Sequence, residues 1–188
     1  PDAPARARLA YDELLANQLA LALVRAHTRR LPGRRLMGDG RLRRRVLMAL
    51  PYSLTGAQTR ALQEIAADLA SGHRMLRLLQ GDVGSGKTVV ALLTMLIAVE
   101  EGAQAVLMVP TEVLARQHHE NLLPLAEVAG VRLGLRSGRD KGKSRAVWLT
   151  GIATGRIDIL VGTHALFQDE VAFHDLAVAV IDEQHRFG

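Results

Sequence analysis

Eight residues at positions 81–88 combine three glycines with a lysine and a threonine at a spacing that can bind phosphate. They match the pattern G-x-x-x-x-G-K-[ST] and read Gly81-Asp82-Val83-Gly84-Ser85-Gly86-Lys87-Thr88. Glycines let the backbone wrap a phosphate, while N–H groups at the start of a helix face its negative charge. In such a loop Lys87 reaches the β and γ phosphates of a nucleotide, and the Thr88 hydroxyl binds Mg²⁺. We therefore predict a nucleotide site here, with a purely structural glycine turn as the less favoured alternative.

Two adjacent acids follow an apolar run near the end of the sequence. The run is Leu176–Ile181, and the acids are Asp182 and Glu183. Parallel sheets gather their sites at the carboxyl ends of strands, so these acids can serve a nucleotide bound by residues 81–88. We predict that Asp182 holds Mg²⁺ through its water shell and that Glu183 polarises the attacking water. An exposed acidic turn after an edge strand is the alternative.

Hydrophobic spacing predicts the elements that must position these residues. Apolar positions recur at helical spacing in three segments before residue 73, which are Leu9–Arg30, Arg41–Leu50 and Ala57–Leu69. A further helix, Val89–Val99, follows the phosphate-binding residues. Short apolar runs predict strands at Met75–Leu79, Ala105–Val109, Val131–Leu135, Ile157–Val161 and Leu176–Ile181. Because these runs lack polar alternation, they indicate strands buried on both faces, and the fold class is α/β with a parallel sheet and flanking helices.

Composition and charge limit the classes of protein to which the chain can belong. The 188 residues are 48% apolar and 23% charged, which fits a soluble globular domain and excludes global disorder. No cysteine is present, so disulfides, thiolate metal sites and cysteine nucleophiles are excluded. The net charge of +5 comes from residues 1–50, which carry 11 basic and 4 acidic side chains (+7), whereas residues 51–188 carry 13 basic and 15 acidic side chains (−2). This basic arm indicates a polyanionic partner or a solvated helix face, and we recognise neither a secretion signal nor a membrane span.

Taken together, the motifs resemble a known family. Asp182-Glu183-Gln184-His185 resembles the DExH box of superfamily 2 helicases, and the continuation Arg186-Phe187-Gly188 is similar to the RecG branch, the fork-reversing DNA helicases. The other blocks that carry the resemblance are Leu54–Gln58, residues 81–88, Pro110–His118 and Gly162–Leu166. The resemblance covers at least residues 50–188. It implies a RecA-like P-loop NTPase lobe, preceded by an N-terminal helical segment, that uses ATP and Mg²⁺.

The resemblance also implies roles for residues outside the phosphate-binding loop. Gln58 is similar to a glutamine that recognises adenine, whose edge requires both a donor and an acceptor, although an exposed helix glutamine is the alternative. Thr111, helped by the charge of Arg116, resembles a contact to the DNA backbone, with helix capping as the alternative. The block Gly162-Thr163-His164 resembles a second DNA contact.

Several histidines lie in or next to these sequence blocks. In the family, Gln184 and His185 couple the nucleotide state to the DNA-binding side, although His185 could equally be a strand-end histidine bonded to the backbone. His118, His119 and His164 have neither a cysteine nor an i,i+4 histidine partner, which argues against a zinc site.

The family pattern divides the chain into two parts. Residues 1–50 correspond to a basic helical linker, and residues 51–188 to the N-terminal RecA-like ATP-binding lobe, truncated after the DExH box. A second lobe supplies arginines that are worth roughly 10³–10⁵ in rate in analogous phosphoryl-transfer systems. We therefore expect the 188-residue chain alone to bind ATP weakly, to hydrolyse almost none and to unwind nothing.

For the intact protein, the resemblance implies an ATP-dependent DNA helicase or translocase that acts on forks and junctions in recombination and repair. The expected partner is branched or forked duplex DNA, in the bacterial cytosol and without a membrane, and a monomer is favoured. Two alternatives remain open. One is a DExH translocase of the transcription-repair coupling type, and the other is a P-loop nucleotide switch without motor activity.

Overall fold

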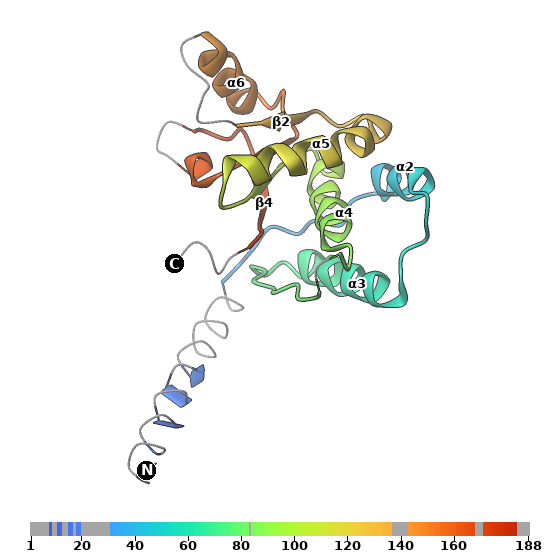
Figure 1. Ribbon diagram of the computed structural model, residues 1–188, viewed down its shortest axis with the longest axis vertical. Helices are drawn as coiled ribbons and strands as arrows, with labels where there is room; N and C mark the ends of the chain where they lie inside the picture. Colours follow the sequence, from blue (N-terminus) through green and yellow to red (C-terminus); the bar gives the residue numbers. More distant parts are fainter. Residues whose placement is uncertain are drawn as a thin grey trace.

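The fold is seen in a computed structural model, which describes residues 31–82, 84–136, 143–167 and 171–183, and near the N-terminus residues 8, 11, 12, 15, 16, 18 and 19 (Figure 1). Most of the helix predicted over Leu9–Arg30 lies outside the described residues, as does Val83. Within the described part, no helix is both long and apolar enough to cross a bilayer.

A four-stranded parallel sheet forms the centre of the structure. The strands are β1 (Gln104–Met108), β2 (Leu133–Leu135), β3 (Ile159–Gly162) and β4 (Leu176–Ile181), in the spatial order β2-β3-β1-β4. Every residue of β1 and β3 is buried, as expected for runs without polar alternation. The predicted α/β fold is therefore confirmed, and four of the five predicted strands are present with shifts of at most two residues at their ends.

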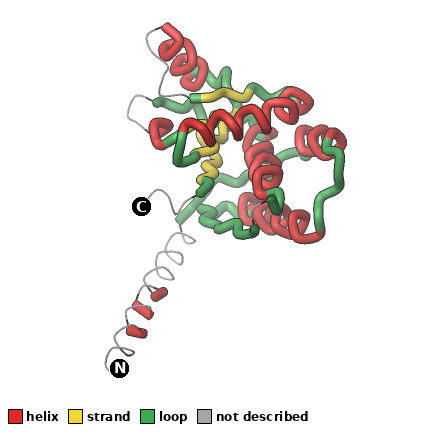
Figure 2. Tube along the Cα trace, in the orientation of Figure 1, coloured by secondary structure: helices red, strands yellow, loops and turns green. Residues whose placement is uncertain are grey.

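The fifth predicted strand, Met75–Leu79, is wrong. Residues 74–82 form an extended loop, drawn in green between two helices in Figure 2. A strand requires a hydrogen-bonded neighbour, and within the described sheet β4 pairs only with β1 and leaves its other edge without a partner. Leu76 and Leu78 are accordingly exposed, by 65% and 68%. The apolar run is therefore part of a loop, and the described sheet does not include it.

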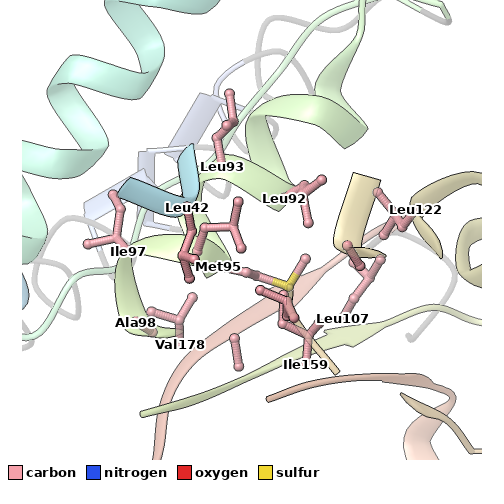
Figure 3. Close-up of a cluster of buried hydrophobic side chains, with 14 of the residues drawn as sticks. Leu42, Leu92, Leu93, Met95, Ile97, Ala98, Leu107, Leu122, Ile159 and Val178 are labelled. Atoms are coloured by element: carbon pink, nitrogen blue, oxygen red, sulfur yellow. The ribbon is translucent and has the colours of Figure 1, made fainter. Parts of the chain in front are cut away.

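Helices cover the two faces of the sheet unequally. On one face, α4 (Lys87–Glu100) and α5 (Glu112–Ala129) pack against the strands, and α2 (Arg41–Ala49) and α3 (Gly56–Ala70) pack against these helices. Figure 3 shows the resulting core, in which Met95, Leu107 and Ile159 lie close together. On the opposite face, α6 (Lys143–Ala153) and the short 3₁₀ helix η1 (His164–Phe167) enclose a smaller apolar cluster.

Residues 31–50 share the larger core. Leu36, Leu42 and Val46 are buried in the same cluster as the helices and strands of the sheet. The start of α2 is held by the buried carboxylate of Glu100, the last residue of α4, which accepts hydrogen bonds from backbone N–H groups of α2. This part of the basic N-terminal segment is therefore packed into the fold.

A buried glutamine joins three loops at the start of the sheet. Gln104, the first residue of β1, is only 4% exposed. Its Nε2 donates to the carbonyl oxygens of Ile152 and Ile157, at 3.1 and 2.7 Å, and its Oε1 accepts from the N–H groups of His174 and Asp175, at 2.8 and 3.1 Å. One side chain thus satisfies four backbone groups that lead into or out of α6, β3 and β4.

Candidate functional site

The phosphate-binding loop ends at Lys87, the first residue of α4, whose side chain folds back over the loop. Its Nζ donates to the carbonyl oxygens of Gly81 and Asp82 at 2.6 and 2.7 Å. Gly84 and Gly86 have φ angles of 80° and 79°, in the left-handed region that favours glycine. The first N–H groups of a helix lack intrahelical acceptors. The start of α4 therefore presents N–H donors and the ammonium group of Lys87 at the same place. A phosphate could therefore replace the two carbonyls as the partner of the ammonium group.

Gln58 lies against this loop. Its Oε1 accepts from the Thr55 N–H at 2.8 Å and completes a capping box at the start of α3. Its Nε2 donates to the Ser85 carbonyl at 2.8 Å. The contact is close, because a Cβ built on Gly86 would lie 2.4 Å from Nε2 of Gln58. The amide assigned to adenine from sequence is thus placed beside the phosphate-binding loop, with both of its ends bound to backbone groups.

Asp182 follows β4 directly and is held in place from several sides. Its N–H donates to the Met108 carbonyl at 2.9 Å, which continues the pairing of β4 with β1. Its Oδ1 accepts from the Glu183 N–H at 2.9 Å, and its Oδ2 lies 2.9 Å from Nε2 of His118. Glu183 has a φ of 53° and is the one described residue other than glycine with a positive φ. The two acids therefore end the strand in a tight turn that few side chains favour.

The residues present fit a magnesium–nucleotide complex. In a parallel sheet, helices that pack antiparallel to the strands begin at the carboxyl edge, and α4 packs against β4. This arrangement brings Thr88, in the first turn of α4, to the edge where Asp182 ends β4. The carboxylate of Asp182 is 35% exposed, and each of its oxygens has one polar partner, the Glu183 N–H or Nε2 of His118, which leaves lone pairs for the water shell of a cation. Among the described residues, no group of three or more His, Asp or Glu side chains is arranged as a metal cage. One carboxylate and one hydroxyl, together with nucleotide phosphates, are a typical environment for Mg²⁺.

The first candidate nucleic-acid contact lies where α5 begins, just after β1. Thr111 is the N-cap, and its Oγ1 accepts from the Leu114 N–H at 3.3 Å, so helix capping is observed. Thr111 is nevertheless exposed, as is Arg116 one turn further along α5. A helix N-terminus with an exposed hydroxyl can also receive a phosphate group.

The second candidate contact follows the neighbouring strand, β3. Gly162 ends β3, and a Cβ built on it would lie 2.9 Å from the Leu166 side chain and 3.0 Å from Cβ of Arg136. Thr163 is only 8% exposed, and its carbonyl accepts from the Leu166 N–H. His164 is exposed. Because β1 and β3 are adjacent and parallel, both candidate contacts lie at the same edge of the sheet as the acids. At the second contact His164 presents its side chain to solvent, whereas that of Thr163 is largely covered.

Two predicted coupling residues, Gln184 and His185, lie outside the described residues. The structure adds one site residue that sequence reasoning missed, His118, because it was considered only as a zinc ligand. A signal was present in the sequence: Ala115 and Leu122, three residues before and four after it, are buried core positions of α5. A histidine on such a stripe faces the sheet and needs a polar partner there.

Comparisons with known proteins show which family the chain resembles. A family profile described as DEAD/DEAH box helicase matches residues 55–188. Proteins named ATP-dependent DNA helicase RecG from Pasteurella multocida and Bacillus subtilis are each 49% identical over 185 residues, which is 98% of this chain and 27% of theirs. The protein of that name from Thermotoga maritima is 44% identical over 184 residues, 98% of this chain and 24% of its own.

A solved structure described as RecG bound to a three-way DNA junction has a TM-score of 0.83 and 43% sequence identity, and the match covers 98% of this chain and 25% of that one. The chain thus spans about a quarter of the length of the relatives it matches. The resemblance to the RecG branch, stated from the motifs, is confirmed over nearly the whole chain.

Proposed function

Because the chain belongs to the DEAD/DEAH box helicase family, we propose that residues 51–188 form the ATP-binding lobe of a RecG-type DNA helicase. The intact protein couples ATP hydrolysis to movement along branched DNA in recombination and repair. The observation that supports the proposal is that α4, which begins at the phosphate-binding loop, packs against β4, the strand that ends at the two acids. Residues 1–50 correspond in this proposal to the basic helical segment that precedes the lobe, and residues 31–50 of it pack into the core of the lobe.

Each residue of the site has a specific task in this proposal. Lys87 leaves the carbonyls of its own loop and binds the terminal phosphates of ATP. Thr88 and Asp182 hold Mg²⁺, which neutralises charge on the phosphates when it is bound. Glu183 orients the attacking water, and Gln58 recognises adenine. Val83 and the remaining loop residues contribute backbone N–H groups to the phosphates.

The nucleic-acid contacts lie at the same edge of the sheet. Thr111 and Arg116 contact one backbone phosphate, and the block of residues 162–164 contacts another. Gln184 and His185, which follow the acids directly, connect the two functions. The proposed partner is a forked or branched duplex in the bacterial cytosol, bound by a monomer, and the solved structure with 43% identity is described as bound to a three-way DNA junction.

The test uses the intact protein that contains this chain. ATPase rates are measured with forked DNA, with linear duplex and without DNA, for the wild type and for Lys87→Ala. We expect forked DNA to stimulate the wild type most strongly, and Lys87→Ala to lose at least about a hundredfold in kcat, as is typical when a transition-state contact is removed. Nucleotide binding that is indifferent to all DNA would point to a switch module instead. Equal stimulation by linear and forked DNA would exclude the preference for branched substrates.

A further inference from the structure

We propose that His118 is a positioning residue of the ATP site, which fixes the carboxylate of Asp182 and connects it to the helix that begins at Thr111. The inference rests on the proposed function, in that Asp182 is taken to hold the cation. None of the roles assigned from sequence includes His118. The contact itself is direct, with 2.9 Å between Nε2 of His118 and Oδ2 of Asp182.

His118 occupies a position where α5 faces the sheet. Ala115 and Leu122 on the same stripe are fully buried, at 1% and 2% exposure, and the histidine side chain is 14% exposed. A polar ring in such a place requires a partner, and Asp182 provides it. Nδ1 of the ring is also buried and has no hydrogen-bond partner among the described residues. Within that part of the chain, the 2.9 Å contact with Asp182 therefore sets the orientation of the ring.

The same contact sets the orientation of the carboxylate. A carboxylate group can rotate about the bond that joins it to Cβ, and that of Asp182 is 35% exposed. The Glu183 N–H donates to Oδ1 from the strand side, and Nε2 of His118 lies 2.9 Å from Oδ2 on the helix side. Polar partners on both oxygens favour one rotational state and leave lone pairs for the water shell of a cation. Without His118, the Glu183 N–H would hold the carboxylate at one oxygen, and the position of the other oxygen would be less restricted.

Helix α5 extends this connection to the nucleic-acid side. His118 lies seven residues after Thr111, which corresponds to about 10 Å along a helix. Helices move as rigid elements, so any shift of Thr111 caused by a phosphate bound at the N-terminus of α5 would move His118 with it. The link from DNA contact to cation ligand thus consists of two helical turns and the 2.9 Å contact between His118 and Asp182. His118 can therefore make the geometry of Asp182 depend on whether DNA is bound.

The test compares variants that keep or remove the donor. In His118→Gln the amide Nε2 is the same number of bonds from Cβ as Nε2 of histidine, so the donor is retained. In His118→Leu an apolar side chain fills the space without a donor. The control is His119→Leu, which changes the neighbouring residue on the same helix. All are made in the intact protein, and thermal unfolding confirms that each variant is folded.

The first measurement does not depend on catalysis. Binding of Mn²⁺, in the presence of a non-hydrolysable ATP analogue, is followed by electron paramagnetic resonance. We expect His118→Leu to weaken Mn²⁺ binding by about tenfold, as for one lost hydrogen bond to a charged group, while His118→Gln and His119→Leu stay within about twofold of the wild type. Unchanged Mn²⁺ affinity in His118→Leu would overturn the proposal. Equal losses in the Leu and Gln variants would overturn the donor role.

The second measurement tests whether His118 couples DNA binding to ATP hydrolysis. In ATPase assays, His118→Leu should lower the stimulation of kcat by forked DNA about tenfold and leave the KM for ATP within about twofold. Equal stimulation of His118→Leu and the wild type would refute the link through α5. If instead the wild type shows no response to DNA, the proposed function fails. The Mn²⁺ measurement still decides whether His118 positions Asp182, so the two failures are distinguishable.

Discussion

Replacing Glu100 by alanine should destabilise the fold strongly, although the residue lies far from the proposed chemistry. Glu100 ends α4, and its side chain has 0% exposure. The carboxylate accepts from the N–H groups of Gly40, Leu42 and Arg43 at 2.9, 2.9 and 3.1 Å, and from the Arg43 guanidinium at 3.0 Å. The N-cap of α2 is Gly40, which has no side chain to cap the helix, so the carboxylate from α4 performs this task.

The magnitude follows from what the substitution leaves behind. Arg43 is only 18% exposed, and removing one partner of such a pair typically costs about 3–5 kcal/mol. The three N–H groups lose their acceptor as well, although those nearest the surface can recruit water. We therefore expect Glu100→Ala to lower the free energy of unfolding by about 3–5 kcal/mol. The melting temperature should fall by about 10 °C.

Urea unfolding followed by far-UV circular dichroism measures this change. The matched control is Glu101→Ala: the neighbouring acid accepts from the N–H groups of Met37 and Gly38, but these contacts are exposed, so the expected loss is below about 1 kcal/mol. Equal effects of the two substitutions would refute the idea that a buried carboxylate fastens residues 31–50 to the lobe.

Two further predictions concern single side chains. Gln104→Leu removes four hydrogen bonds of a buried side chain and should lower the free energy of unfolding by about 2–4 kcal/mol, whereas Gln63→Leu on the surface of α3 should change it by less than about 0.5 kcal/mol. Similar values for both variants in urea unfolding would contradict the role of Gln104. Gly86→Ala should weaken nucleotide binding by at least about tenfold in a fluorescent-nucleotide titration, because the new Cβ meets Gln58 and the backbone has a φ of 79°. Gly102→Ala serves as its control, because Gly102 also has a positive φ but no atom lies within 4 Å of the added Cβ. Comparable nucleotide affinities of the two variants would show that the contact with Gln58 is unimportant.

Local patterns were sufficient for much of the fold. The apolar run Leu176–Ile181 coincides with β4, and the predicted helix Ala57–Leu69 differs from α3 by one residue at each end. Both have clear local boundaries, an acid pair in one case and an N-capping threonine in the other. The Met75–Leu79 run failed for a different reason. Its composition favours a strand, but strand formation depends on a neighbour, and composition does not reveal whether one is present.

The candidate site, like the fold, could be predicted only in part from local sequence patterns. The motif of the proposed phosphate-binding loop could be recognised because it lies in eight consecutive residues, and the helix that follows it begins at Lys87, two residues before the predicted start at Val89. His118 was missed because its partner Asp182 is distant in sequence and only the packing of α5 on the sheet brings them together. The link from Glu100 to the start of α2 was invisible for the same reason. Contacts between elements that are distant in sequence thus cannot be predicted from periodicity or from motifs.

The two hydrogen bonds of Gln58 have a consequence for selectivity. Its Oε1 accepts from the Thr55 N–H and its Nε2 donates to the Ser85 carbonyl, which leaves one lone pair and one N–H of the amide for a further partner. Because both ends of the amide are held by backbone groups, its remaining donor and acceptor point in fixed directions. In the proposed adenine site, the side chain would therefore lose little conformational freedom when a base binds. A base whose edge does not match the fixed donor and acceptor would gain neither hydrogen bond, so the rigidity of Gln58 would favour one class of base over the others.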